Sequence, residues 1–388
     1  MKPQRLSAAL AAASLVFVSG CATISDAIDA VNPFSSSGPK MAELTPFTPT
    51  VDLKTAWTAS MGKAAHYALV PAVVGNAVFV AGGDGGIAKF EEGVQVWRVN
   101  AGQSLSGGVG SDGKLVVVGT AKGDVLAFAA ADGKPLWQTR VSSEVLAPPA
   151  VGEPGVAVRS GDNRVFLLDG ADGKRKWVYQ RPTPSLSLRS IAAPVFADRF
   201  IFVGFPGGKL VALALNNGGT VWEGTVALPR GTTELDRVAD VVAPPVVDGR
   251  TVCAVAYQGR VACFDLAQGG NLVWARDFSS AAGIALDGRY LFLTDDSGAV
   301  HALDRATGAS VWKQDKLLNR RVSAPAVRRG LVAVGDVKGV VHFLSREDGS
   351  FAARHNTDGG AIVAAPQVVG TNFLVQTVGG GVSALAVE

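Results

Sequence analysis

Cysteine and histidine are scarce in this chain, which has three cysteines and four histidines among 388 residues. A protein metal centre is usually built from a cluster of such side chains, often together with aspartate or glutamate. His301 and His342 occupy matching positions of a repeated segment, and no such cluster completes a ligand set around them. We therefore expect no metal site and interpret both histidines as tolerated variants of one strand position.

Charge and long apolar runs are also limited. Charged residues make up 18% of the sequence and the formal net charge is +3, a near balance that gives no support for nucleic-acid binding. The apolar stretch at residues 6–18 is too short to span a bilayer comfortably as a permanent helix. Hydrophobic residues nevertheless reach 48% and glycines number 47, a composition typical of buried strands joined by many tight turns.

The seven tryptophans recur at a nearly constant interval. They are Trp57, Trp97, Trp137, Trp177, Trp222, Trp274 and Trp312, which are 40, 40, 40, 45, 52 and 38 residues apart. A repeat of about 40 residues is typical of a β-propeller blade.

Each interval contains the same unit of strands and turns. Residues 290–312 read YLFLTDDSGAVHALDRATGASVW, in which two apolar runs flank a tight turn and a second turn leads to tryptophan. This pattern predicts an antiparallel hairpin. A short segment entered through proline, such as APPAV ending at Val151, predicts a third strand before the hairpin, and the tryptophan segment supplies a fourth. One period therefore forms a four-stranded antiparallel sheet.

Eight hairpins of this kind can be counted, the last at residues 372–387, and eight tryptophan positions if Ala352 is aligned with them. Trp57 precedes the first hairpin, and no tryptophan segment follows the last one. The strand containing Trp57 is thus expected to complete the last sheet, which removes open edges. The sequence predicts an all-β fold over residues 51–388, an eight-bladed β-propeller closed by pairing of the N-terminal strand with the C-terminal blade.

Residues 1–20 have the pattern of an export signal, with a basic start, a short apolar stretch and small residues before Cys21. The ending VSGC resembles the lipobox of bacterial lipoproteins, in which the cysteine becomes the lipidated first residue; the alternative is an ordinary buried or free cysteine. Ala22 after the cysteine, by the same resemblance, implies delivery to the outer membrane, facing the periplasm. Residues 21–50 are rich in proline and serine without periodicity, and we expect them to form a flexible tether.

The period stretches at two places, and both extensions lie in the connection from a tryptophan strand to the next blade. Residues 181–190 read RPTPSLSLRS and residues 226–242 read VALPRGTTELDRVADVV. Consecutive blades place such connections side by side on one face of a ring. Loops on a rigid scaffold are where function concentrates, so this face is the candidate functional surface.

The first insertion carries Leu186, Leu188 and Arg189, and the second adds charged residues that include Asp240. Leucines beside an arginine are a composition favoured at protein interfaces. The alternative is an excursion whose leucines only cover the blade below. We interpret the two insertions as a docking surface for a peptide or protein partner.

The repeat resembles that of pyrroloquinoline quinone enzymes and their noncatalytic relatives. Residues 302–312 match the spacing A-x-D-x-x-T-G-x-x-x-W, and the resemblance implies that the tryptophan docks against the neighbouring blade. A quinoprotein site would also require calcium ligands, a catalytic base and often a disulfide between adjacent cysteines, which this sequence does not supply. We therefore expect no enzyme activity and no cofactor.

The insertions themselves, with LSLR followed by TELDRVADV and APPVV, resemble the BamB family of outer-membrane assembly lipoproteins. The resemblance implies a lipid-anchored propeller that binds a periplasmic POTRA domain of BamA and assists insertion of outer-membrane proteins, with unfolded precursors as candidate further partners. It assigns partner contacts to Leu186, Leu188, Arg189 and Asp240; this chain has Val242 where the family pattern carries a second acid. The alternatives are a PQQ-like periplasmic oxidoreductase and a lipid-anchored propeller that binds another envelope partner.

Cys253 and Cys263 lie in the two strands of one hairpin and flank the turn YQGR. They either form a disulfide, which an oxidising compartment permits, or remain two buried thiols. The strand register decides between these, because a slip of one residue moves a side chain to the opposite face. Of the two, we favour the buried thiols slightly.

Overall fold

The structure, a computed structural model, describes residues 39–64 and 67–387. The chain divides into two units, residues 1–40 and residues 41–388. The predicted signal peptide, Cys21 and most of the predicted tether lie outside the described residues. Within the described ranges, no helix is both long enough and apolar enough to cross a membrane.

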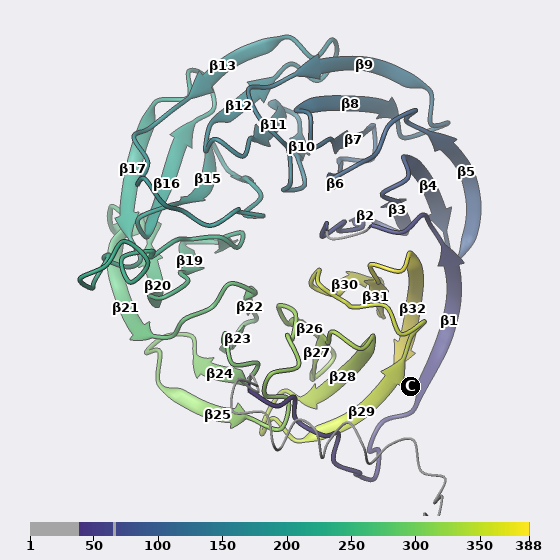
Figure 1. Ribbon diagram of the computed structural model, residues 1–388, viewed down its shortest axis with the longest axis vertical. Coiled ribbons are helices and arrows are strands. Elements are labelled where there is room, and N and C mark those ends of the chain that lie inside the picture. The colour runs from purple at the N-terminus through teal and green to yellow at the C-terminus, as the bar shows by residue number, and fades with distance from the viewer. Residues whose placement is uncertain (1–38, 65–66, 388) are drawn as a thin grey trace, which may run out of the picture. The chain divides into compact units, whose positions relative to one another are not determined.

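The second unit is a ring of eight four-stranded antiparallel sheets, here called blades 1 to 8 (Figure 1). Blades 1 to 4 are β2–β5 (Ala72–Val74, Ala77–Ala81, Gly86–Glu91, Val94–Asn100), β6–β9 (Gly107–Ser111, Leu115–Gly119, Asp124–Ala129, Pro135–Arg140), β10–β13 (Ala150–Gly152, Gly155–Arg159, Val165–Leu168, Arg175–Tyr179) and β14–β17 (Val195–Ala197, Phe200–Phe205, Lys209–Ala214, Thr220–Thr225). Blades 5 to 7 are β18–β21 (Val246–Asp248, Thr251–Val255, Arg260–Asp265, Asn271–Asp277), β22–β25 (Gly283–Leu286, Tyr290–Thr294, Val300–Asp304, Ser310–Gln314) and β26–β29 (Ala326–Arg328, Leu331–Gly335, Val340–Ser345, Phe351–Asn356). Blade 8 combines β30–β32 (Gln367–Val369, Asn372–Gln376, Gly381–Val387) with β1 (Leu53–Ser60), and a short 3₁₀ turn, η1 (Leu266–Gln268), precedes β21.

The ring closes as the sequence predicts. Strand β1 pairs antiparallel with β32, from Leu53 opposite Val387 to Ser60 opposite Gly381. The first strand of the ring is therefore the outermost strand of the last blade, beside the C-terminal end (Figure 1). Both the eight-bladed fold and its closure by the N-terminal strand are confirmed.

The hydrophobic core lies between successive blades. Phe79 of β3 and Val116 of β7 belong to one buried cluster, and Phe343 of β28 meets Phe373 of β31 edge to face with ring centroids 5.3 Å apart. A blade is covered on both faces, so its inner strands require apolar residues in consecutive positions instead of alternating ones. Strand β11 is accordingly buried over its whole length.

The tryptophans lie in the outermost strands, and six of their indoles donate a hydrogen bond to a main-chain carbonyl of the next blade. Trp312, for example, donates from Nε1 to the carbonyl of Arg346 at 2.8 Å. The turn glycine Gly349 lies on the same indole with a positive φ of 72°, and a Cβ there would come within 2.5 Å of the ring. The predicted docking of tryptophan on the neighbouring blade is confirmed.

Blade 7 has alanine at the tryptophan position, but one residue later than predicted. Trp312 pairs with Ala302, and the residue that pairs with the matching Phe343 is Ala353. Ala352 occupies the bulge that precedes this position, so the alignment of Ala352 with the tryptophans was wrong. No hairpin turn connects the two outer strands of blade 8, β32 and β1, and a tryptophan at residue 353 would lack the turn on which the others dock.

Residues 42–50 pack along blade 7 before β1 begins. The amide of Thr50 donates to the carbonyl of Ala352 at 2.9 Å, and the ring of Phe47 stacks on Phe351 with centroids 5.4 Å apart. These contacts cover the outer strand β29, whose Ala352 is buried. The last part of the segment that we expected to be a tether therefore contacts the ring.

Cys253 and Cys263 face each other in the ladder between β19 and β20 and form a disulfide, with Cα atoms 4.1 Å apart. Our preference for two buried thiols was therefore wrong, because the register places both side chains on the same face.

The two matched histidines make the same contact in their own blades. His301 Nε2 lies 2.8 Å from Asp295 Oδ2 and His342 Nε2 lies 3.0 Å from Asp336 Oδ2, so each histidine contacts the aspartate that opens the turn of its own hairpin.

Candidate functional site

The two insertions lie next to each other on one face of the ring, as predicted. The first insertion connects β13 to β14 and the second connects β17 to β18. Ser185 donates through Oγ to Glu234 Oε2 at 3.2 Å, and the amide of Leu188 donates to Asp240 Oδ2 at 2.8 Å. The two connections are therefore joined directly and form a single surface.

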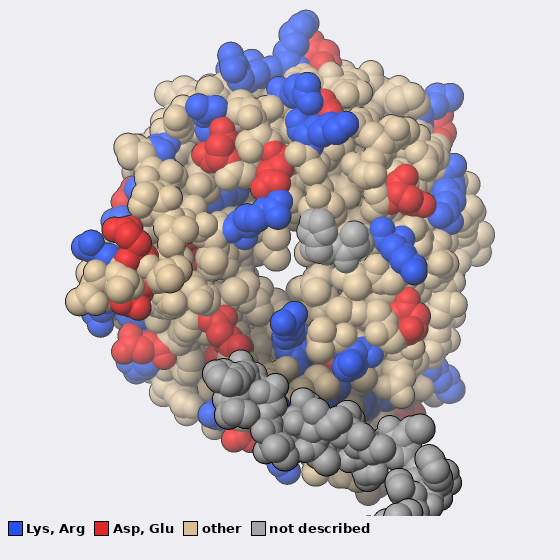
Figure 2. Space-filling view, in the orientation of Figure 1, with Lys and Arg blue, Asp and Glu red and all other residues tan. Residues whose placement is uncertain are grey.

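The face that Figure 2 presents has a central opening and an even distribution of charge. Lysine and arginine side chains are interspersed with aspartate and glutamate around the opening, on a surface made mostly of uncharged residues. No large region of one sign surrounds the opening in this view. This face therefore presents its charge through individual side chains and not as a broad region of one sign.

Asp240 lies beneath the surface and joins three parts of the site. It is 1% exposed, and its Oδ2 and Oδ1 atoms accept hydrogen bonds from the amides of Leu188 at 2.8 Å and Gly207 at 3.0 Å. Its own carbonyl accepts from the amide of Tyr257 in blade 5 at 2.9 Å. The carboxylate predicted to contact a partner instead holds the Leu188 segment against the turn of blade 4.

A buried arginine lies under the same surface. Arg159 donates to the carbonyl of Gly204 at 2.6 Å and to Asn163 Oδ1 at 2.8 Å, and its guanidinium lies over the ring of Phe205, 5.3 Å from the centroid. Burial lowers the pKa of Arg159 to about 10, although the negative charge of Asp240 opposes this shift. Because that pKa is far above neutrality, the side chain keeps its charge at neutral pH.

The other three predicted residues face solvent. Leu186 is 40% exposed and Leu188 is 36% exposed. Arg189 also points outward, and its Nε atom donates to Glu144 Oε1 at 3.0 Å while Nη2 contacts the other carboxylate oxygen. The hydrogen bond and the charge of Glu144 raise the pKa of Arg189. Two leucines and a fixed guanidinium thus share one outward surface.

Sequence reasoning missed three members of this surface and the buried Arg159 beneath it. Leu228 and Leu235 of the second insertion are 56% and 70% exposed, and the letters VALPRGTTELDR show them as plainly as LSLR shows the first pair. Glu144 comes from the connection between blades 2 and 3, and no pattern in the sequence links it to Arg189. Arg159 ends the strand β11, where an arginine in a buried run was the available signal.

Val242 occupies the position where the family pattern carries a second acid. Its side chain is buried, and its carbonyl accepts a hydrogen bond from Ser190 Oγ at 3.4 Å. The residue therefore joins the two insertions through its backbone. In the parts of the chain that the structure describes, no group of three or more His, Cys, Asp or Glu residues is arranged to hold a metal ion.

Comparisons with known proteins agree with this architecture. A family model described as outer membrane protein assembly factor BamB matches residues 83–314. The proteins of that name from Bordetella pertussis and Burkholderia pseudomallei are 45% identical over 365 residues and 44% identical over 377 residues. These matches cover 94% of this chain and 92% of the relative in the first case, and 96% of each in the second. The Escherichia coli protein of the same name is 31% identical over 384 residues, which cover 95% of this chain and 96% of that protein.

Solved structures show the same fold in proteins of two kinds. The crystal structure of BamB from Moraxella catarrhalis superposes with a TM-score of 0.81 at 28% identity, covering 86% of this chain and all of that one. A quinohemoprotein alcohol dehydrogenase from Comamonas testosteroni reaches a TM-score of 0.69 at 14% identity, covering 87% of this chain and 76% of that one. At that identity the dehydrogenase shows a shared fold alone. The family model and the relatives, which span nearly the whole chain, show that it belongs to the BamB family of outer membrane protein assembly factors.

Proposed function

We propose that this chain is a noncatalytic scaffold lipoprotein of the outer-membrane β-barrel assembly machinery. In this proposal Cys21 carries the lipid and holds the protein at the periplasmic face of the outer membrane. The ring binds a POTRA domain of BamA and assists insertion of outer-membrane proteins, whose unfolded precursors are further candidate partners. Membership of a family named for outer membrane protein assembly supports the proposal.

The single observation that carries the proposal is the joined surface of the two insertions. Leu186, Leu188 and Arg189 project from a segment whose backbone is hydrogen-bonded to the buried Asp240. Arginine is among the residues that most often supply the binding energy of an interface, and the exposed leucines beside it add apolar area that a partner can bury. Because the segment is already held in place, it loses less conformational entropy when a partner docks than a mobile loop would.

Within this proposal the four residues have two different roles. Leu186, Leu188 and Arg189 touch the partner directly. Asp240 is a positioning residue, since its side chain is buried and acts through the amide of Leu188. Arg189 is already paired with Glu144, so an acidic group of the partner would share or replace that ion pair.

A double substitution tests the surface. We expect Leu188→Ala with Arg189→Glu to abolish copurification with BamA from detergent-solubilised membranes, because removing two central contacts weakens binding by roughly 30-fold or more. The matched control, Val311→Ala with Lys313→Glu, makes the same kinds of change on the outer strand β25, where Val311 is 42% exposed, and should copurify normally. Normal recovery of BamA with the Leu188 and Arg189 variant would refute the assigned surface.

The noncatalytic part of the proposal has its own test. Purified protein is incubated with pyrroloquinoline quinone and calcium, and both bound chromophore and alcohol oxidation are measured. We expect neither. A stoichiometric chromophore with turnover would assign the chain to the oxidoreductases that share its fold.

A further inference from the structure

Trp222 departs from the way the other tryptophans dock. Trp274 donates to the carbonyl of Arg305, three residues before the turn glycine Gly308. The other tryptophans that donate to the next blade also bond to the carbonyl three residues before its turn glycine. Trp222 donates instead to the turn glycine Gly270 itself, at 3.2 Å. The cause lies in blade 5, whose turn between β20 and β21 contains η1 and is one residue longer than the matching turn of blade 6.

A second departure from the repeat makes room for this indole. Gly224 follows Trp222 by two residues, and a Cβ at Gly224 would come within 2.5 Å of the indole ring. The matching position of other blades holds a side chain, as in Thr139 or Gln314. The indole can therefore turn toward Phe264, which it meets edge to face with centroids 5.1 Å apart.

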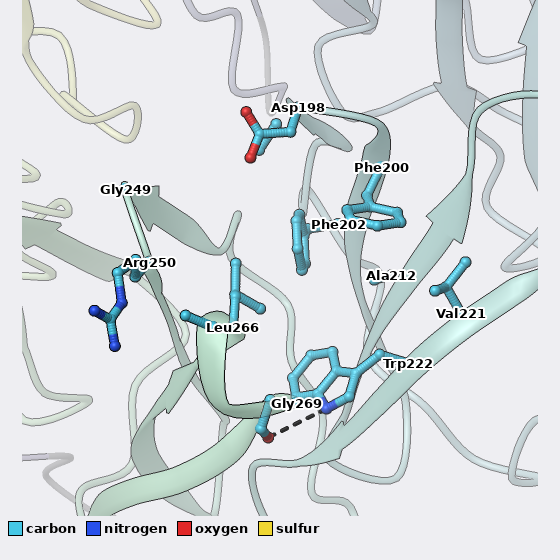
Figure 3. A pocket seen from close by; sticks show the side chains of 13 residues that line it. Asp198, Phe200, Phe202, Ala212, Val221, Trp222, Gly249, Arg250, Leu266 and Gly269 are labelled. Carbon is cyan, nitrogen blue, oxygen red and sulfur yellow. Dashed lines mark hydrogen bonds between the residues drawn. The ribbon is translucent and has the colours of Figure 1, made fainter.

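An aromatic pocket lies beside this indole, between blades 4 and 5. Its volume is about 420 Å³, within the range of pockets that bind small ligands or single large side chains. Phe200, Phe202, Trp222 and Leu266 surround it, as Figure 3 shows. The walls come from strands β15, β16 and β17 and from the β14–β15, β18–β19 and β20–β21 turns, which lie at the opposite ends of the strands from the insertions.

One acidic and one basic side chain line this pocket, and within the described part of the chain only the basic one has an ion-pair partner. Asp198 lies at one end, beyond the two phenylalanine rings, whereas the guanidinium of Arg250 lies on the far side of Leu266 (Figure 3). Arg250 is paired with Asp265 at 3.0 Å. The carboxylate of Asp198 has no hydrogen bond or ion pair with any residue that the structure describes. Its backbone has a positive φ of 50°, which aspartate tolerates in a tight turn.

We propose that this pocket binds a polypeptide segment in which an aromatic side chain is flanked by a basic residue. The aromatic ring packs against Phe200, Phe202 and Trp222, where edge-to-face and offset contacts favour aromatic groups over aliphatic ones. The basic group lies near Asp198, which has no ion-pair partner among the residues that the structure describes. The proposal does not depend on the proposed function, because the pocket shares no residue with the insertion surface.

Fluorine NMR of the detergent-solubilised full chain tests this site. The protein is labelled with 5-fluorotryptophan, and the resonance of Trp222 is assigned by its loss in Trp222→Phe. End-blocked tripeptides Lys-Phe-Lys, Glu-Phe-Glu and Lys-Ala-Lys are then titrated. We expect a saturable shift of the Trp222 resonance with Lys-Phe-Lys, roughly threefold or more weaker binding of Glu-Phe-Glu because one surface charge contact reverses sign, and no shift with Lys-Ala-Lys.

Two variants make the outcome decisive. Asp198→Asn should bring the affinities for Lys-Phe-Lys and Glu-Phe-Glu close together, and Leu266→Trp, which fills the pocket from its rim, should abolish the response to both. The other six tryptophan resonances report whether each variant is folded. The proposal is overturned if Lys-Phe-Lys leaves the Trp222 resonance unchanged at millimolar concentration, if Lys-Ala-Lys shifts it equally, or if the preference for lysine persists in Asp198→Asn.

Discussion

Replacing Asp240 by alanine should release the Leu188 segment from the ring. The carboxylate accepts hydrogen bonds from the amides of Leu188 at 2.8 Å and Gly207 at 3.0 Å, and a hydrogen bond to a charged group contributes roughly 1.5–3 kcal/mol. Both amides are only partly buried, so water can replace the lost acceptor and the lower value applies to each. The expected cost is about 3 kcal/mol for the two together.

Hydrogen–deuterium exchange measures this cost where it arises. A loss of about 3 kcal/mol raises the population of the open segment about a hundredfold, and the amides of residues 182–191 should exchange correspondingly faster. We also expect weaker copurification with BamA, because the exposed leucines and arginine no longer start from a fixed position. The strands of distant blades should keep their protection.

The matched control is Asp236→Ala in the same insertion. Asp236 is exposed, and its carboxylate accepts hydrogen bonds from residues of its own turn, including the amide of Thr233 at 3.1 Å, so exchange of residues 182–191 should not change. If Asp240→Ala leaves that exchange at the wild-type rate, or accelerates exchange equally around the whole ring, then Asp240 does not position the Leu188 segment.

Two further predictions concern stability. Removal of the disulfide in the double variant Cys253→Ala, Cys263→Ala should lower the free energy of unfolding by roughly 2–3 kcal/mol, because the bond closes a short loop in the unfolded chain. Reductant should destabilise the wild type by a similar amount and should not affect the variant. Equal denaturation midpoints of all samples would contradict this prediction. Burial raises the pKa of Asp336, but hydrogen bonds from His342, a backbone amide and Arg320 outweigh it and lower the pKa from 3.8 to about 2. The lowered pKa therefore adds roughly 2 kcal/mol to the free energy of unfolding when the pH is above the pKa of Asp336 in the unfolded chain, and this stabilisation is lost as the pH falls toward 2. Denaturation curves should show this loss in the wild type, and an equally steep loss in Asp336→Asn would refute the assignment.

The ring could be predicted from the sequence because its construction depends on local spacing. Each tryptophan after Trp57 lies four residues after the turn glycine of its own blade and packs on the turn glycine of the next blade, as Trp312 packs on Gly349. Repetition of that spacing therefore specifies both the sheet and its neighbour. The same spacing identifies Ala353, which follows Gly349 by four residues as Trp312 follows Gly308, so the alignment of Ala352 misread the repeat by one residue.

Features that depend on strand register or on distant neighbours could not be predicted in this way. The disulfide required Cys253 to stand directly opposite Cys263, and the sequence left the register open. The insertions were recognisable as a surface, yet the burial of Asp240 follows from its contact with Gly207 on another strand turn. The pairing of Arg189 with Glu144 joins connections of two different blades and has no signature in either segment.

The pairing of β1 with β32 sets the order in which this protein can fold. Strand β1 is made before all the other strands of the ring and its partner is made after them, so the contact between them has the greatest sequence separation of any in the ring. Contacts of that kind form slowly, because the entropy of bringing distant segments together is lost before any stabilising interaction is gained. A nascent chain of this protein therefore passes through an open arc in which β32 has an unpaired edge and β1 has no partner. It depends on rapid final docking, or on assistance, to avoid aggregation.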